Sequence, residues 1–213
     1  MPECLEDTLT SDELNLFHSL DSPVKIQAFL DTVEYPATER NRCPVNVMRD
    51  RQGHCLDGAL FAAAALRRLG YPPRLVDIFP HPGMDDDHVL AVFQKNGCWG
   101  AVAKSNFVGL RYREPVYRSL RELAMSYFEF FFNVDGVKTL RTITRPVNLA
   151  KLDHLGWECQ DSGADTVEHR LLSLRRFPLI SADMAAGLEL VDPLTYKAGT
   201  MATNPAGLYK PKP

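Results

Sequence analysis

The chain has 213 residues, of which 45% are hydrophobic and 24% are charged, and its formal net charge is -3. This length is enough for one domain with a substantial core, and the composition excludes a largely disordered chain. A net charge so close to zero provides no strong positive field, so we expect neither nucleic acid nor a membrane surface as a partner.

The N-terminus has neither a basic start nor a long apolar run, and no stretch approaches the roughly 20 apolar residues that cross a bilayer. We therefore expect a cytoplasmic protein. The five cysteines are scattered without CxxC pairs, which predicts reduced thiols, no zinc site and no cofactor. They are Cys4, Cys43, Cys55, Cys98 and Cys159.

Two helices are predicted at the start of the chain. Thr10 and Glu13 have the spacing of a capping box, so we expect a helix to begin there. Ser22 followed by Pro23 is a second start signal, and apolar residues follow it at helical spacing. Residues 36–52 are rich in charge and turn formers, so we expect a loop.

A third helix is predicted over residues 56–69, LDGALFAAAALRRL, because this run consists of strong helix formers and Gly70 can end it. Its surface is apolar nearly all round, so it belongs in the middle of a core. A strand is expected at 74–79. The polar loop that follows contains three aspartates at 85–87, which we expect to be solvated.

A β-hairpin is predicted next. Residues 88–93 and 98–105 are two strand-like runs on either side of Asn-Gly at 96–97, the dipeptide that favours a two-residue hairpin turn. With such a turn, Lys95 pairs with Cys98.

The rest of the chain is less regular. Residues 112–133 show a helical stripe that ends in an aromatic cluster, which we expect in the core. Short strand-like runs and a helix near 167–176 follow, and the last twenty residues suggest an extended tail. The predicted organisation is a core over residues 1–133 with N-terminal helices, and a C-terminal extension over 134–213 that packs on it.

Two residues have the setting of a catalytic pair. Cys55 stands directly before the long predicted helix, where the positive end of the helix dipole lowers a thiol pKa and favours the nucleophilic thiolate. His88 opens the first hairpin strand after a loop, where an imidazole can face a cleft and act as the base. Taken singly, either residue could instead be an inert core residue.

A third group should orient the imidazole. The register of a two-residue turn places Ser105 opposite His88, whereas a longer turn places Lys104 or Asn106 there. The amide oxygen of Asn106 is the better acceptor for an imidazole N–H. Ser105 and Asn106 therefore both remain candidates. No metal is expected, because the histidines and cysteines match no zinc spacing.

These segments resemble a known family. G-H-C-L-D-G-A at 53–59, the alanine-rich helix, and L-G-Y-P-P-R-L-V at 69–76 resemble the nucleophile segment of transglutaminase-like proteins. His88 at the head of a strand, followed by a turn and a strand from Trp99, is similar to the family's histidine and aspartate hairpin. The resemblance covers residues 49–107. It implies an α+β, papain/transglutaminase-like core with a central helix packed on a small antiparallel sheet.

The resemblance also implies an activity. Cys55 matches the family's nucleophile and His88 its base, which implies a cysteine-dependent hydrolase or acyltransferase that acts on an amide (peptide-like) bond through a thioester. Where the family usually has aspartate, this chain has Lys-Ser-Asn at 104–106, and the papain branch uses asparagine there. The alternative is a catalytically degenerate domain that serves as a binding or scaffolding module.

Overall fold

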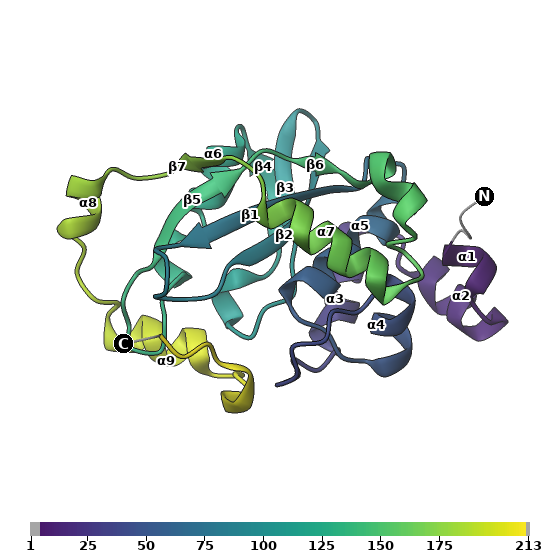
Figure 1. The fold of residues 1–213 in the computed structure, drawn as a ribbon, viewed down its shortest axis with the longest axis horizontal. Helices are drawn as coiled ribbons and strands as arrows, with labels where there is room; N and C mark the ends of the chain where they lie inside the picture. The colour runs from purple at the N-terminus through teal and green to yellow at the C-terminus, as the bar shows by residue number, and fades with distance from the viewer. Residues whose placement is uncertain (1–4, 212–213) are drawn as a thin grey trace.

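A computed structural model describes residues 5–211 of the chain. It has an α+β fold in which helices pack on one antiparallel sheet, as predicted (Figure 1). Among the described residues, no helix is long and apolar enough to cross a membrane. Cys4 lies outside the described residues, and Cys43, Cys55 and Cys98 carry no disulfide.

The helices and 3-10 turns occupy both ends and the middle of the chain. The α-helices are α1 (Leu5–Thr8), α2 (Ser11–Ser19), α3 (Pro23–Asp31), α4 (Pro44–Asp50), α5 (Cys55–Arg68), α6 (Leu120–Met125), α7 (Asp161–Leu172), α8 (Ala182–Ala186) and α9 (Pro193–Thr200). The 3-10 turns are η1 (Val108–Leu110), η2 (Phe128–Phe130), η3 (Leu149–Leu155) and η4 (Pro205–Gly207).

The strands form a single sheet in the order β4-β3-β2-β1-β5-β7, and β6 also pairs with β1. They are β1 (Arg74–Pro80), β2 (His88–Lys95), β3 (Cys98–Val102), β4 (Arg113–Tyr117), β5 (Leu140–Thr144), β6 (Val147–Asn148) and β7 (Arg176–Pro178). Every pairing is antiparallel. The C-terminal extension therefore adds strands to the sheet of the core.

The predicted hairpin is confirmed. Lys95 pairs with Cys98, and the turn residues Asn96 and Gly97 have φ angles of 52° and 79°. Left-handed φ at both turn positions matches the right-handed twist of the flanking strands, which explains why Asn-Gly was an informative signal.

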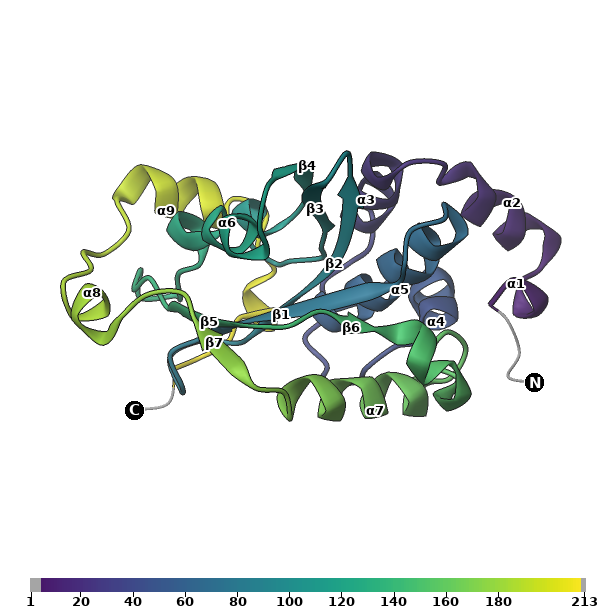
Figure 2. The same cartoon turned by 90° about the horizontal axis from the view of Figure 1, so that it is seen from above.

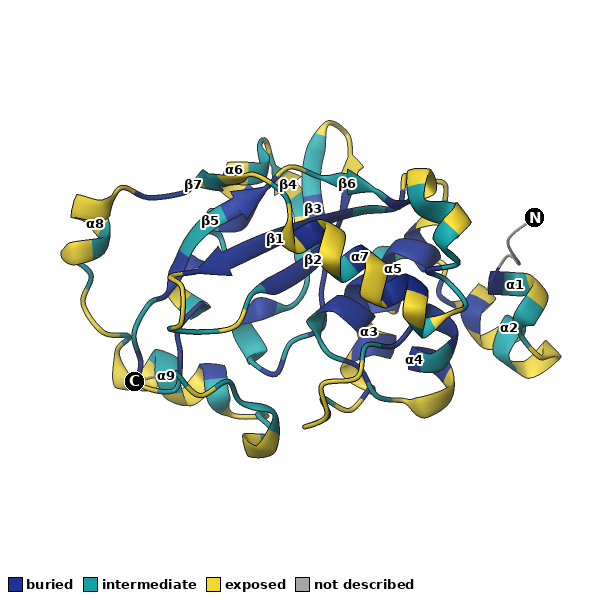
Figure 3. Ribbon diagram, viewed as in Figure 1, coloured by how far each residue is buried: buried dark blue, intermediate teal, exposed yellow. Residues whose placement is uncertain are grey.

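The two faces of the sheet carry separate hydrophobic clusters. One face holds Val89, Ala91 and Phe93 of β2 against α5, and the other holds Leu90 and Val92 against α6. Helix α5 is buried along most of its length, as predicted, and β1, β2 and α5 are mostly in the buried colour in Figure 3. In Figure 2, α7 lies on one side of β1 while α6 and α9 lie on the other.

Several predicted elements need correction. The loop expected at 36–52 contains α4, and the helix expected over 112–133 is divided into β4, α6 and η2. Helix α7 begins and ends earlier than the predicted 167–176 segment. The last twenty residues contain α9 rather than a wholly extended tail. The capping box of Thr10 with Glu13 is confirmed at α2.

Candidate functional site

A pocket of about 610 Å³ lies at the N-terminal end of α5 and includes Cys55. The segment before α5, strand β1, the loop before β2, helix α7 and the C-terminal segment all contribute to its walls. The lining residues that carry polar or reactive groups are Tyr35, Thr38, Glu39, Asn41, His54, Cys55, Asp77, Asp86, Asp87, Glu168 and Tyr209. Carboxyl groups predominate among its charged groups, so the pocket is acidic.

Hydrogen bonds at the start of α5 hold Cys55 at the pocket. The buried carboxylate of Asp57 accepts from the backbone N–H of His54 at 2.9 Å and from that of Arg42 at 2.8 Å. This interaction of Asp57 with the helix N-terminus ties the first turn of α5 to the preceding loop. The Arg42 guanidinium in turn donates to Gln52, which does not line the pocket.

The thiol of Cys55 is half-buried, and its Sγ donates to the carbonyl oxygen of Asp87 at 3.8 Å. Burial raises the pKa of Cys55 well above the usual thiol value, and the nearby carboxylates of Asp87 and Asp86 raise it further. This direction is opposite to the lowering that the helix dipole leads one to expect. The thiol is protonated near neutral pH.

The ring of His88 lies on the face of the sheet opposite to Cys55. His88 pairs with Ile78, which belongs to the cluster on the α6 face, and its ring stands edge-on to Tyr127 of the same cluster at 6.3 Å between centroids. The next residue, Val89, points to α5 and lines the pocket. Because successive side chains of a strand point to opposite faces, the predicted pair of Cys55 with His88 is not formed.

Neither candidate for the third position forms a hydrogen bond with the imidazole. The Nε2–H of His88 donates to the backbone carbonyl of Leu110 at 2.7 Å. Ser105 Oγ accepts from the backbone N–H two residues further on, at 3.0 Å. Asn106 exchanges two hydrogen bonds with the backbone of Asn204, at 2.8 and 2.9 Å. The structure therefore assigns Ser105 to a local turn and Asn106 to holding the C-terminal segment.

Three carboxyl groups that were not predicted as site residues line the pocket, and two of them, Asp86 and Asp87, belong to the aspartate run that was expected to be simply solvated. Asp77 is fully buried on β1, and Asp86 and Asp87 come from the loop before β2. Burial raises the pKa of Asp77 well above its usual value, and contact with Asp87 raises it further. Burial and Asp87 likewise raise the pKa of Asp86 to about 7. A charged residue inside an otherwise apolar strand was the signal for Asp77.

The described histidine, cysteine, aspartate and glutamate side chains form no group of three that could hold a metal ion. A scan against known protein families finds no match to this chain, and a search of curated proteins finds none either.

Proposed function

We propose that the chain is a papain/transglutaminase-like domain that binds a ligand in the pocket containing Cys55 and does not carry out Cys-His catalysis. The observation that carries this proposal is the position of His88. Its ring is buried on the far face of the sheet and its Nε2–H is committed to the carbonyl of Leu110. A nucleophile and its base need to be within hydrogen-bond reach of one another, and these two residues are not.

The fold assignment is supported by the segments that carry the resemblance. Helix α5 begins at Cys55 and packs against one face of the sheet, which includes the β2-β3 hairpin. A buried helix whose first residue is the cysteine, on an antiparallel sheet whose hairpin begins with the histidine, is the arrangement that the resemblance implies. A pocket of about 610 Å³ also lies within the usual size of small-ligand sites.

The protonation states also favour binding over catalysis. Burial lowers the pKa of His88 to about 4, so its imidazole is neutral at physiological pH. The thiol of Cys55 is protonated there as well, because its pKa is raised. The neighbouring histidine, His54, has its Nε2 3.1 Å from the carbonyl oxygen of Pro36 and so is already engaged. Within the described part of the pocket, the Cys55 thiol donates to the Asp87 carbonyl and not to an imidazole.

A second candidate is the cysteine-dependent hydrolase or acyltransferase, with a peptide-like amide as substrate. It is favoured by the placement of Cys55 at the first residue of a 14-residue helix, where backbone N–H groups can stabilise an oxyanion, and beside an open pocket. The thiolate would add to the carbonyl carbon, the amine would leave with a proton, and water would cleave the thioester. His88 would first have to turn to the α5 face.

Alkylation of Cys55 as a function of pH distinguishes the two candidates. We expect the rate of iodoacetamide labelling, followed for the Cys55 peptide by mass spectrometry, to rise only above the free-thiol pKa of about 8.5. The buried thiol of Cys43, whose pKa burial raises to about 12, provides an internal comparison. A Cys55 midpoint below 7, or amide hydrolysis that the Cys55→Ala variant lacks, would overturn the binding proposal in favour of the enzyme.

A further inference from the structure

The buried carboxyl group of Asp77 lacks the donors that such a group requires. Its side chain has no exposed surface, and among the described residues no N–H or hydroxyl donates to either of its carboxylate oxygens. Only its backbone is satisfied, through a 3.0 Å hydrogen bond to Thr144 Oγ1. An isolated carboxylate is very unfavourable away from water, so this group must share a proton or meet a cation.

The charges around Asp77 do not neutralise it. From the loop before β2 it faces the carboxyls of Asp87 and Asp86, and from α5 it faces the thiol of Cys55. Arg176 of β7 is the one cation among the groups that shift its pKa, and it donates no hydrogen bond to it. Without a ligand, the carboxyl groups of Asp77 and Asp87 can form a hydrogen bond with each other only if one of them carries a proton. A ligand with positive charge can replace that proton.

We propose that this pocket binds an organic cation through a guanidinium group, with the carboxyls of Asp77 and Asp87 at its floor and that of Asp86 at its mouth. This inference rests on the proposed function and names its ligand class. Both oxygens of Asp77 lack donors, and the planar guanidinium offers paired N–H groups to a carboxylate. An ammonium group offers a single point charge. Because Asp77 has no exposed surface without a ligand, the partly exposed side chain of Asp87 must move aside for the guanidinium to reach it. Further support comes from Glu39 and Glu168 on the pocket wall, which add negative charge.

Two aromatic rings that line the pocket suit the same ligand. Tyr35 and His54 lie with their ring centroids 5.1 Å apart, and both line the pocket. A guanidinium plane stacks favourably on such faces. The C-terminal segment from Ala206 to Tyr209 also lines the pocket and helps to exclude water, which strengthens charge pairing.

Three ligands with the same butyl chain test the inference by isothermal titration calorimetry on the full chain: n-butylguanidinium, n-butylammonium and n-butanol. We expect n-butylguanidinium to bind most tightly, n-butylammonium at least threefold more weakly, and n-butanol not measurably. Binding should release protons, seen as a heat that depends on the buffer, and should tighten from pH 6 to pH 8 as the carboxyls ionise. Equal binding of butanol and butylguanidinium, or tighter binding of butylammonium, would overturn the proposal.

Variants of the carboxyl pair complete the test. Asp77→Asn and Asp87→Asn should each weaken n-butylguanidinium binding at least tenfold, whereas Asp12→Asn on the exposed surface of α2 should not change it. Circular dichroism shows which variants fold, and Asp87 lies in the loop between β1 and β2, outside the helices and strands. Unchanged affinity in a folded Asp77 or Asp87 variant would contradict the assignment.

The two proposals can fail separately. If Cys55 titrates as a thiolate below pH 7 while n-butylguanidinium still binds, the proposed function is wrong and the cation site stands. If the thiol is unreactive at that pH and no cation binds, the inference about the ligand is wrong, and the binding domain would need another ligand.

Discussion

At the scale of single residues, the role of His88 is determined by the face of the sheet on which its side chain lies. The ring is 4% exposed, stands edge-on to Tyr127 and donates to the carbonyl of Leu110. Desolvation lowers its pKa to about 4, although the Leu110 carbonyl and Asp87 act in the other direction. The residue is therefore a neutral part of the core, which holds η1 against the start of β2.

This environment predicts a pH dependence of stability. The unfolded chain takes up a proton on His88 near pH 6.5, and the folded chain does so only near pH 4. Stability from this group is therefore fully present above about pH 6.5 and is lost as the pH falls to 4, by roughly 3 kcal/mol. In His88→Gln, which keeps a donor for Leu110, this loss should disappear from urea unfolding curves.

The comparison with the parent protein is needed because the raised pKa values of Asp77 and Asp86 act in the opposite sense, stabilising the fold as the pH falls. His169→Gln on the exposed face of α7 serves as the control and should leave the parent pH profile unchanged. If His88→Gln and the parent lose stability in parallel between pH 6.5 and 4, the neutral core assignment is incorrect.

The sequence could show the alternation of β2 but could not show which face meets α5. His88, Leu90 and Val92 alternate with Val89, Ala91 and Phe93, and both sets are buried. In a strand with one wet face the apolar set identifies the core side. Here a helix covers one face and an aromatic cluster covers the other, so the pattern carries no such information. The placement of Cys55 needed only a local signal and was predicted correctly.

At the scale of elements, hydrogen bonds made by Asn204, which we call the clasp, hold the C-terminal segment against the rest of the fold near the pocket. Asn204 exchanges backbone hydrogen bonds with the side chain of Asn106, and its own amide donates to the carbonyl of Tyr35 at 2.8 Å. The adjoining turn at Gly207 runs so close that a Cβ there would lie 2.9 Å from the carbonyl oxygen of Pro36. This clasp explains why the segment is ordered although its composition favours an extended chain.

Asn106→Ala should loosen this clasp. It removes two hydrogen bonds, which costs about 1–3 kcal/mol of local stability, so the segment should open more often and expose the pocket. We expect labelling of Cys55 by iodoacetamide at pH 9 to become several-fold faster, as measured on the Cys55 peptide. Asn148→Ala, which removes the cap of η3 away from the pocket, is the matched control. Equal labelling rates in parent, variant and control would show that the clasp does not cover Cys55.

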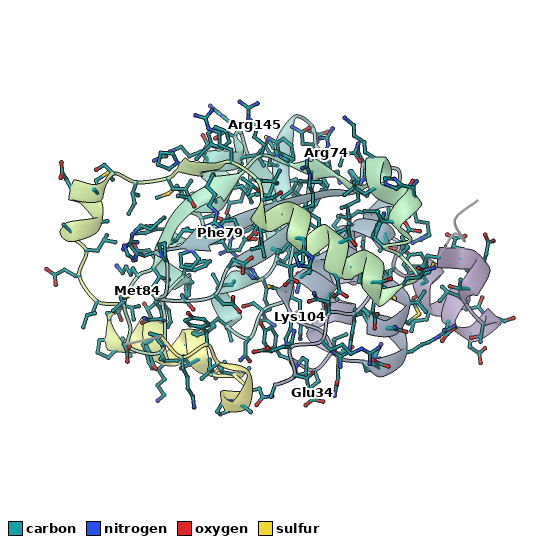
Figure 4. All side chains as sticks on the ribbon, viewed as in Figure 1. Glu34, Arg74, Phe79, Met84, Lys104 and Arg145 are labelled. Atoms are coloured by element: carbon teal, nitrogen blue, oxygen red, sulfur yellow. The ribbon has the colours of Figure 1, made fainter. Side chains whose placement is uncertain are left out.

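The side chain of Lys104 likewise anchors α3, the second of the predicted helices, to the segment that follows β3. The Nζ of Lys104 donates to the carbonyl of Leu30 in the last turn of α3 and to that of Val33 just after it, and Lys104 is labelled below the sheet in Figure 4. Gln27 of the same helix binds the backbone N–H and carbonyl of Ala103. The segment at 103–106, where the resemblance leads one to expect a catalytic group, instead fastens α3 and the C-terminal segment to the sheet.

Elements with local signals were predictable, and elements that depend on distant partners were not. Helix α5 and the β2-β3 hairpin were identified from helix formers and from Asn-Gly. Strands β4, β5 and β7 are three to five residues long and exist because a neighbouring strand satisfies their backbone groups. Nothing within such a short run indicates its partner. The sequence alone therefore did not predict how β4, β5 and β7 pair in the sheet.

At the scale of the whole molecule, the extension from residue 134 is part of the same folding unit as the preceding core. Strand β5 pairs with β1 at the centre of the sheet. From the same extension, Trp157, Val167 and Leu171 join the cluster around α5, while Leu140 and Leu179 join the cluster on the other face. Both clusters thus contain residues from each side of the predicted boundary at 133.

The two tryptophans of the chain report on the two parts separately, since Trp99 lies on β3 and Trp157 lies after η3. The Trp157→Phe variant keeps Trp99, whose fluorescence reports on the core. The Trp99→Phe variant keeps Trp157, whose fluorescence reports on the extension. Because the parts share one sheet and both clusters, we expect the fluorescence and far-UV circular dichroism curves of each variant to coincide in urea. A fluorescence midpoint for Trp157 well below the circular dichroism midpoint would mean that the extension unfolds first, so that the shared sheet does not couple the two parts.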